Sequence, residues 1–130
     1  MSAISVDVAL YGPIFRPGVP RRVMADYTDA AVSRVARHGK AEVDKMLHRV
    51  LRHPTGNYQA HIRIREFSAA AVIHDSRIIY GRWLEGTGSR NFPKTIFKGY
   101  HTFRTVHAAL VPRAAEIAQV ILPHYLRRLQ

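Results

Sequence analysis

The sequence contains no cysteine among its 130 residues. That absence excludes disulfide bonds, zinc sites built on thiolates and cysteine nucleophiles. No apolar run approaches the ~20 residues that a membrane-spanning helix needs. The first seven residues carry no basic region followed by an apolar stretch, so we expect no signal peptide and no membrane among the partners.

Acidic residues are scarce, with nine Asp and Glu against 20 Lys and Arg, which gives a formal net charge of +11 at pH 7. Hydrophobic residues make up 47 % of the chain, so it is not a disordered basic tail. The length suits one domain, which we assign to residues 1–130. The basic excess is concentrated from Arg77 to Arg113, where Glu85 is the only acid. Charge of this sign, taken alone, points to nucleic acid as a partner.

The first half of the chain alternates between strand and helix patterns. Period-two alternation predicts a strand over residues 4–10, and apolar residues at three-to-four spacing predict a helix from about Arg22 to Leu51. The turn-forming residues 53–57 should end that helix. Two strands are then expected over Tyr58–Phe67 and Ala69–His74, with a bend or bulge between them.

The second half predicts a short helical turn over Tyr80–Leu84 and a long loop over Glu85–Gly99. A second long helix is expected over Tyr100–Leu129, bent or restarted where Pro112 and Pro123 remove amide donors. The pattern therefore predicts an α+β fold, in which a small antiparallel sheet is packed by two long helices, with a long glycine-containing loop.

No motif of enzymatic chemistry is complete in the sequence. The glycine-rich loop lacks the glycine that a phosphate-binding loop places before its lysine, because Pro93 precedes Lys94. The eight histidines include no pair at the spacing of a helical zinc site. These patterns therefore predict no metal site and no nucleotide-binding loop.

Two alternatives from other functional classes stay open. A nucleic-acid-binding protein would combine basic side chains over residues 90–104 with stackable rings, namely Phe92, Phe97 and Tyr100. A small metal-independent ribonuclease would use the predicted strand that carries Tyr58, His61, Arg63 and Arg65. Strand alternation places the tyrosine on the opposite face from the other three, which weighs against the ribonuclease.

The most specific pattern runs from Tyr80 to Asn91 and continues over Phe97–Arg104. It resembles the head–tail joining proteins, also called neck or tail-completion proteins, of bacteriophages with long non-contractile tails. The residues that match the core motif of that family are Tyr80, Glu85, Gly86 and Thr87.

The resemblance implies a structural virion protein without enzymatic activity or cofactor. Such a protein assembles with itself as a ring of six copies, between the head connector or stopper and the tail tube or tail terminator. The implied location is the head–tail junction of the virion, and the host cytoplasm during assembly, with DNA in transit through the lumen as a secondary partner. The residues implied for assembly are Tyr80, Arg82, Trp83, Glu85, Gly86, Thr87, Gly88, Arg90, Lys94, Lys98 and Arg104.

The chemistry of this motif suggests how it would act in an assembly. We expect Tyr80 and Trp83 to anchor the short helix in the core or at a subunit boundary, since large rings with one polar atom suit both places. Glu85 should be stabilised by Arg82 or Arg90, or by amides of the glycine turn.

The glycines of the motif are expected to shape the loop. Gly86 and Gly88 should adopt positive φ angles and let the loop leave at a sharp angle toward a neighbour. The basic stretch over residues 90–104 would then meet acidic protein surfaces or passing DNA. We therefore interpret the net charge chiefly as a property of an interface.

Overall fold

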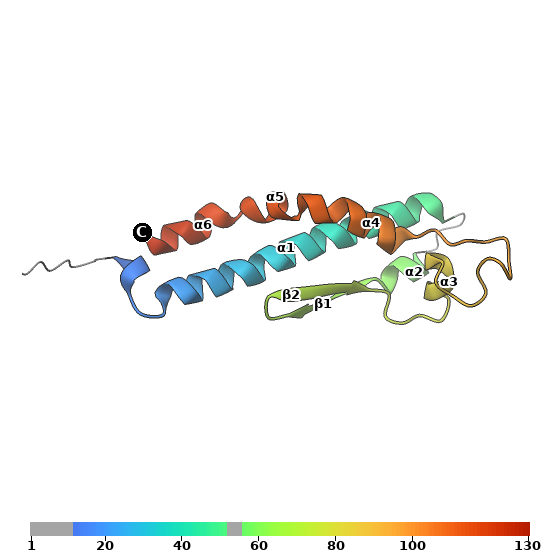
Figure 1. Ribbon diagram of the computed structural model, residues 1–130, viewed down its shortest axis with the longest axis horizontal. Coiled ribbons are helices and arrows are strands. Elements are labelled where there is room, and N and C mark those ends of the chain that lie inside the picture. The colour runs from blue at the N-terminus through green and yellow to red at the C-terminus, as the bar shows by residue number, and fades with distance from the viewer. Residues whose placement is uncertain (1–11, 52–55) are drawn as a thin grey trace, which may run out of the picture.

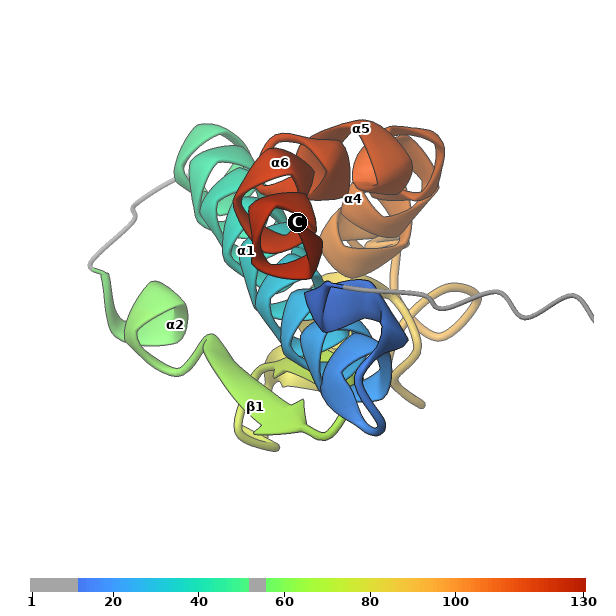
Figure 2. The same cartoon turned by 90° about the vertical axis from the view of Figure 1, so that its left-hand side faces the viewer.

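The computed structural model describes residues 12–51 and 56–130 and has an α+β architecture (Figure 1). A long helix forms the middle layer, with a β-hairpin along one side and a broken helical path, running antiparallel, along the other (Figures 1 and 2). The elements in chain order are η1 (Pro13–Phe15), α1 (Val19–Val50), α2 (Asn57–Ala60), β1 (Arg63–Phe67), β2 (Ala70–His74), α3 (Gly81–Glu85), α4 (Thr102–Leu110), η2 (Val111–Arg113), α5 (Ala114–Gln119), α6 (Leu122–Leu126) and η3 (Arg127–Leu129).

Helix α1 confirms the long helix that the apolar spacing predicts. It begins after Gly18 with a proline in its first turn, where a missing amide costs nothing. Its buried residues recur at helical spacing and include Val23, Ala31, Ala36, Val43 and Leu47. The chain becomes extended at Leu51, so the helix ends there. The strand predicted over residues 4–10, and most of the predicted turn at 53–57, lie outside the described residues.

The hairpin confirms two antiparallel strands but shortens the first. Arg63 pairs with His74 and Phe67 with Ala70, so a two-residue turn at 68–69 joins the strands where a bend or bulge was expected. The prediction of a strand over residues 58–60 was wrong, because these residues form α2. Gly56, with a φ of 83°, starts this helical turn by accepting a hydrogen bond from the Ala60 amide at 2.9 Å. Alternation of apolar residues over so few positions fits one turn of helix as well as a strand.

The C-terminal path confirms a helix that prolines interrupt. Helix α4 gives way to a single 3-10 turn at Pro112, and α5 ends before a break that precedes Pro123. Proline lacks an amide hydrogen, so the helical ladder loses a bond at each site and the path bends.

The main core lies at one end of α1, beneath α3 and the start of α4. Its buried side chains come from five elements or their flanks, and they are Val43, Leu47, Tyr58, Ile62, Leu84 and Val106. This cluster fixes α3 and α4 relative to α1, and the long loop between α3 and α4 is therefore held by a packed base.

Gly39 is the point of α1 that both the hairpin and the C-terminal path approach closely. A Cβ atom there would lie 2.8 Å from Cδ1 of Ile73 and 2.9 Å from Cδ2 of Leu110. We expect Gly39→Ala to change the free energy of unfolding by less than about 1 kcal/mol, because the gain in helix propensity offsets the shift of two flexible side-chain ends. Gly39→Leu should lower it by about 2 kcal/mol through overpacking. Urea unfolding measures both variants, and a Gly39→Leu protein as stable as the wild type would contradict this packing.

Candidate functional site

The Glu85 side chain, at the end of α3, caps the first turn of α4. Its Oε2 atom accepts a hydrogen bond from the Phe103 amide and its Oε1 atom one from the Arg104 amide, both at 3.0 Å. Amides at a helix N-terminus have no partner within the helix and carry partial positive charge. His101, the residue before α4, supplies no side-chain cap of its own. The carboxylate therefore ties the two ends of the long loop together.

The prediction that Arg82, Arg90 or amides of the glycine turn stabilise Glu85 was wrong. Within residues 12–51 and 56–130, no lysine or arginine forms an ion pair with it, and the amides of residues 86–88 donate to other acceptors. Amides fixed in a helical backbone give charge-assisted hydrogen bonds without ordering a long side chain. Arg82 and Arg90 are thus left free to face solvent or a partner.

The loop over residues 86–101 is closed at its base by backbone hydrogen bonds. The Tyr100 amide donates to the Leu84 carbonyl at 2.7 Å, and the His101 amide donates to the Glu85 carbonyl at 3.2 Å. Together with the Glu85 cap, these bonds hold the outgoing and returning segments side by side. The loop is therefore long but anchored.

Two glycines make this close approach of backbones possible. Gly86 and Gly99 both have a φ of 97°, and a Cβ atom on Gly99 would overlap the Gly86 Cα atom. The positive φ predicted for Gly86 is confirmed. The same prediction for Gly88 was wrong, since Gly88 is not among the residues with positive φ. Gly88 is constrained by lack of space, because a Cβ atom added there would lie 3.2 Å from the backbone nitrogen of Trp83.

Asn91 organises the loop from inside. It is only 5 % exposed, and its Oδ1 atom accepts a hydrogen bond from the Gly88 amide at 2.8 Å. Its Nδ2 atom donates to the carbonyls of Trp83 and Phe97 at 2.9 and 3.3 Å. Sequence reasoning did not single out Asn91 as a site residue. The available signal was an asparagine in a glycine-rich turn, where its side chain commonly bonds the backbone.

We expect Asn91→Ala to loosen the loop while leaving the rest of the fold intact. The substitution leaves the Trp83 carbonyl and the Gly88 amide without their partner and removes one of the two donors to the Phe97 carbonyl, at a cost of about 1–2 kcal/mol. Amide hydrogen exchange should accelerate at Gly88 and at Phe92, whose amide bonds the Phe97 carbonyl at 3.1 Å, and should stay unchanged in α1. Ser89→Ala, which removes one exposed hydroxyl from the same loop, is the matched control. Unchanged exchange in the Asn91→Ala loop would show that Asn91 does not hold it.

An aromatic cluster supports the base of the loop. The Phe97 ring lies 4.4 Å from the Trp83 ring and 5.0 Å, edge-on, from the Tyr100 ring, measured between centroids. Phe97 and Tyr100 are therefore occupied in packing, whereas Phe92 is 64 % exposed with the Lys98 ammonium 5.5 Å from its centroid. Of the three rings proposed for base stacking, Phe92 is the exposed one.

Tyr80 anchors the start of α3 to the preceding segment. Its hydroxyl accepts a hydrogen bond from Nδ2 of Asn57 at 2.7 Å, and its ring lies 5.8 Å from the Tyr58 ring. Tyr58 is buried, and its hydroxyl donates to Asp75 at 3.4 Å. Burial, followed by the nearby Asp75 carboxylate, raises the pKa of Tyr58 well above its usual range. In the candidate ribonuclease set, Tyr58 is thus a neutral core residue on α2, while Arg63 lies exposed on β1.

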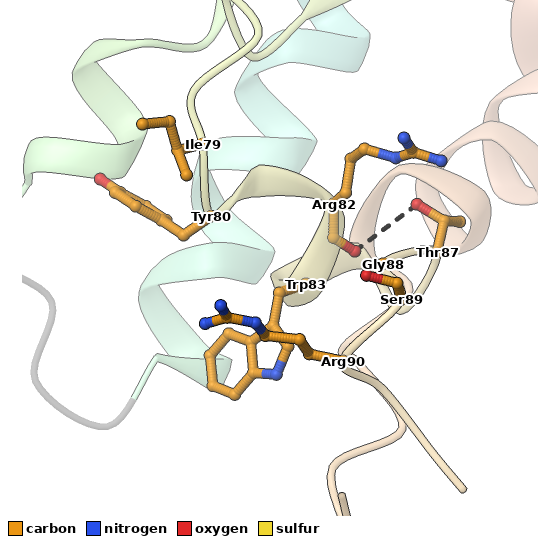
Figure 3. A pocket seen from close by; sticks show the side chains of 8 residues that line it. All are labelled: Ile79, Tyr80, Arg82, Trp83, Thr87, Gly88, Ser89 and Arg90. Carbon is orange, nitrogen blue, oxygen red and sulfur yellow. Dashed lines mark hydrogen bonds between the residues drawn. The ribbon is translucent and has the colours of Figure 1, made fainter. Parts of the chain in front are cut away.

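Large apolar side chains are exposed around α3 and the loop. Ile79 is 98 % exposed and Ile96 is 95 % exposed. An open cavity of about 770 Å³ lies against α3, lined by Ile79 on one side and by the turn of the loop at residues 87–90 on the other (Figure 3). We call this region the loop-end surface; its members are Ile79, Tyr80, Arg82, Trp83, Thr87, Gly88, Ser89 and Arg90, which line the cavity, with Phe92, Lys94, Ile96 and Lys98 on the loop.

The structure brings most of the predicted assembly residues together. In Figure 3, Tyr80 and Arg82 project to different sides of α3, and the Thr87 hydroxyl donates to the Arg82 carbonyl at 3.5 Å. Glu85 and Gly86 do not line the cavity, because they hold the base of the loop. Arg104 is exposed in the first turn of α4.

No protein-family model, no curated protein and no solved structure matches this chain. In the part of the chain that the structure describes, no three histidine or acidic side chains gather to hold a metal ion. No helix in that part is both long enough and apolar enough to cross a membrane.

Proposed function

We propose that this protein is a structural subunit of the bacteriophage head–tail connection and assembles as a ring of six copies. The observation that carries the proposal is the pair of isoleucines on the loop-end surface, Ile79 and Ile96, which are almost wholly exposed beside an anchored loop. Exposed apolar groups rimmed by polar ones mark sites of protein–protein contact. A loop held at its base loses little conformational entropy when a neighbour binds it.

The charge of the loop-end surface supports a ring in preference to a two-fold dimer. A two-fold contact would place the same patch on both subunits, and so would oppose like charges from Arg82, Arg90, Lys94 and Lys98. A head-to-tail contact joins this patch to a different surface of the next subunit, and it produces a ring when the rotation closes. The surface also lies at one end of the long axis of the molecule, where such a contact can form (Figure 1).

The proposed ring lies between the head connector or stopper and the tail tube or tail terminator, at the head–tail junction of the virion. In this role the protein binds neighbouring proteins and carries out no chemistry of its own. DNA in transit through the ring is a secondary partner, attracted by the basic side chains of the loop. In this proposal the loop-end surface positions each subunit against the next one in the ring.

Assembly is tested by placing charge at the two exposed isoleucines. We expect an Ile79→Asp/Ile96→Asp double variant to be a monomer under conditions where the wild type is a ring, because a buried carboxylate in an apolar contact is strongly disfavoured. Both side chains are solvent-exposed in the single chain, so we expect the variant to keep the native fold. A single cooperative thermal unfolding transition checks this. Size-exclusion chromatography with light scattering gives the mass.

The matched control is Met24→Asp/Val111→Asp, which adds the same charge at two apolar residues that are 55 % and 60 % exposed and lie outside the loop-end surface. That variant should keep the wild-type mass. An Ile79→Asp/Ile96→Asp variant that also keeps the wild-type mass would remove the loop-end surface from the assembly contact.

A further inference from the structure

A second surface runs along the seam between α1 and the C-terminal helices, from Thr105 near the base of the loop to Arg127 near the C-terminus. It consists of three adjoining hollows of about 510, 480 and 160 Å³. The first two share Arg34, Arg37 and Val120, and the last two share His38 and Arg113. The three hollows therefore form one continuous cleft, which we call the seam cleft.

The floor of the seam cleft is apolar and partly open to solvent. Its apolar lining residues include Ala30, Met46, Val106, Leu110, Ile117, Val120 and Ile121. Val120 is 63 % exposed. The α1 residues that line the cleft run from Ala30 to Arg49, which at the rise of a helix corresponds to roughly 28 Å. This length matches about five helical turns.

Both banks of the seam cleft carry arginines. Arg34 and Arg37 come from α1, whereas Arg113 and Arg127 come from the C-terminal path. None of the four has an acidic partner among the described residues, since the ion pairs there are Lys40–Asp44 and Arg128–Asp26. Arg37 bonds only to its own helix, through Ser33. The acids that line the cleft are Glu42 and Glu116.

We propose that the seam cleft binds an amphipathic helix of a partner protein whose apolar face is flanked on both sides by acidic residues. Two helices packed side by side leave a groove that the apolar face of a third helix can fill. Arginines on both banks are placed to bind carboxylates on both flanks of that helix, often in bidentate geometry. A nucleic-acid backbone would satisfy the arginines but would leave the apolar floor without a partner.

A second copy of this chain is a poor occupant. Its long helix α1 carries seven Lys and Arg against four Asp and Glu, so it would oppose the arginine banks. The seam cleft also shares no residue with the loop-end surface. The inference therefore stands apart from the ring proposal.

The test uses a synthetic 18-residue peptide, capped at both ends, with leucine along one helical face, glutamate on both flanks and alanine or glutamine elsewhere. Titrated into the full chain and followed by fluorescence anisotropy, it should bind saturably at one site per chain. Arg34→Glu/Arg113→Glu should weaken binding about tenfold, because two attractions become repulsions. Val120→Asp should weaken it at least as much, by placing a charge on the apolar floor.

The matched control is Arg21→Glu/Lys45→Glu, which makes the same change in net charge at two exposed residues of α1 outside the cleft. It should bind the peptide as the wild type does. A peptide with lysine in place of glutamate should prefer the Arg34→Glu/Arg113→Glu variant to the wild type. Repeating the titration with the Ile79→Asp/Ile96→Asp variant should leave the affinity unchanged, which separates this inference from the ring.

Three results would overturn the inference. One is the absence of saturable binding by the acidic peptide in both the wild type and the Ile79→Asp/Ile96→Asp variant. Another is an equal loss of binding in the control variant, which would reduce the effect to net charge. The third is displacement of the peptide by a 20-base-pair DNA duplex whose binding falls steeply with salt, which would assign the cleft to a nucleic-acid backbone.

Discussion

Gly99→Ala is expected to lower the free energy of unfolding by about 3 kcal/mol, the largest effect of any single substitution proposed for this protein. The new methyl group would overlap the Gly86 Cα atom and would lie 2.7 Å from the Glu85 carbonyl carbon. These are backbone atoms, which cannot move aside as a side-chain end can. Left-handed backbone strain at a φ of 97° adds to the overlap. Urea unfolding followed by the fluorescence of Trp83 measures the loss.

Gly56→Ala separates backbone strain from overlap. Gly56 has a similar φ of 83°, yet nothing lies within 4 Å of the position that its Cβ would take. We expect this substitution to cost only about 1 kcal/mol. Equal losses at Gly56 and Gly99 would show that the close crossing of the two backbones at the base of the loop contributes nothing.

Glu85→Ala is expected to lower the free energy of unfolding by about 2 kcal/mol, because the amides of Phe103 and Arg104 lose the carboxylate that caps α4. Glu85→Gln keeps one acceptor oxygen and should lose about half as much. Hydrogen exchange at the two amides should accelerate in the order wild type, Gln, Ala. The same variants should weaken ring assembly, since the cap holds the base of the loop that carries Ile96.

Glu66→Ala is the control for the loss of an acid. The Glu66 side chain is exposed on β1 and accepts one hydrogen bond, from the Ser33 hydroxyl at 2.7 Å. Its removal should change stability by no more than about 0.5 kcal/mol. If Glu85→Ala were equally mild and left exchange at Phe103 unchanged, the capping role of Glu85 would be refuted.

Much of the fold could be predicted because it depends on local patterns. Apolar spacing predicts α1 and the C-terminal path, alternation predicts β1, and the prolines at 112 and 123 mark where the path breaks. The prediction of a strand was wrong at residues 58–60, where the positive φ of Gly56 and the burial of Tyr58 in the core favour a helical turn. Such a choice depends on tertiary packing, which alternation over three residues does not encode.

Most residues of the candidate site could be predicted from the sequence, but the hydrogen bonds that connect them could not. The glycine-rich motif drew attention to residues 80–104, and the cavity against α3 gathers most of the residues named from it. The partner of Glu85 lies 18 and 19 positions away in sequence, and nothing in a local pattern says which amides a carboxylate will reach. Asn91 was missed for the same reason, since its burial becomes apparent only when the loop folds back on itself.

In the folded chain, the basic side chains lie on two separate surfaces. The sequence places most of the basic excess between Arg77 and Arg113, and part of that excess lies on the loop-end surface. The structure adds a second cationic surface, the seam cleft, by joining Arg34 of α1 to Arg127 near the C-terminus. Two helices that pack antiparallel bring such distant residues together. Counting charges along the sequence therefore does not reveal this second cationic surface.

The mass of the purified 130-residue protein in solution tests the central claim most directly. Light scattering is predicted to give a discrete species close to six times the chain mass of 14.8 kDa, which dissociates when Ile79 and Ile96 are both replaced by aspartate. A stable single chain of 14.8 kDa, with the same mass in the wild type and in that variant, would contradict the account.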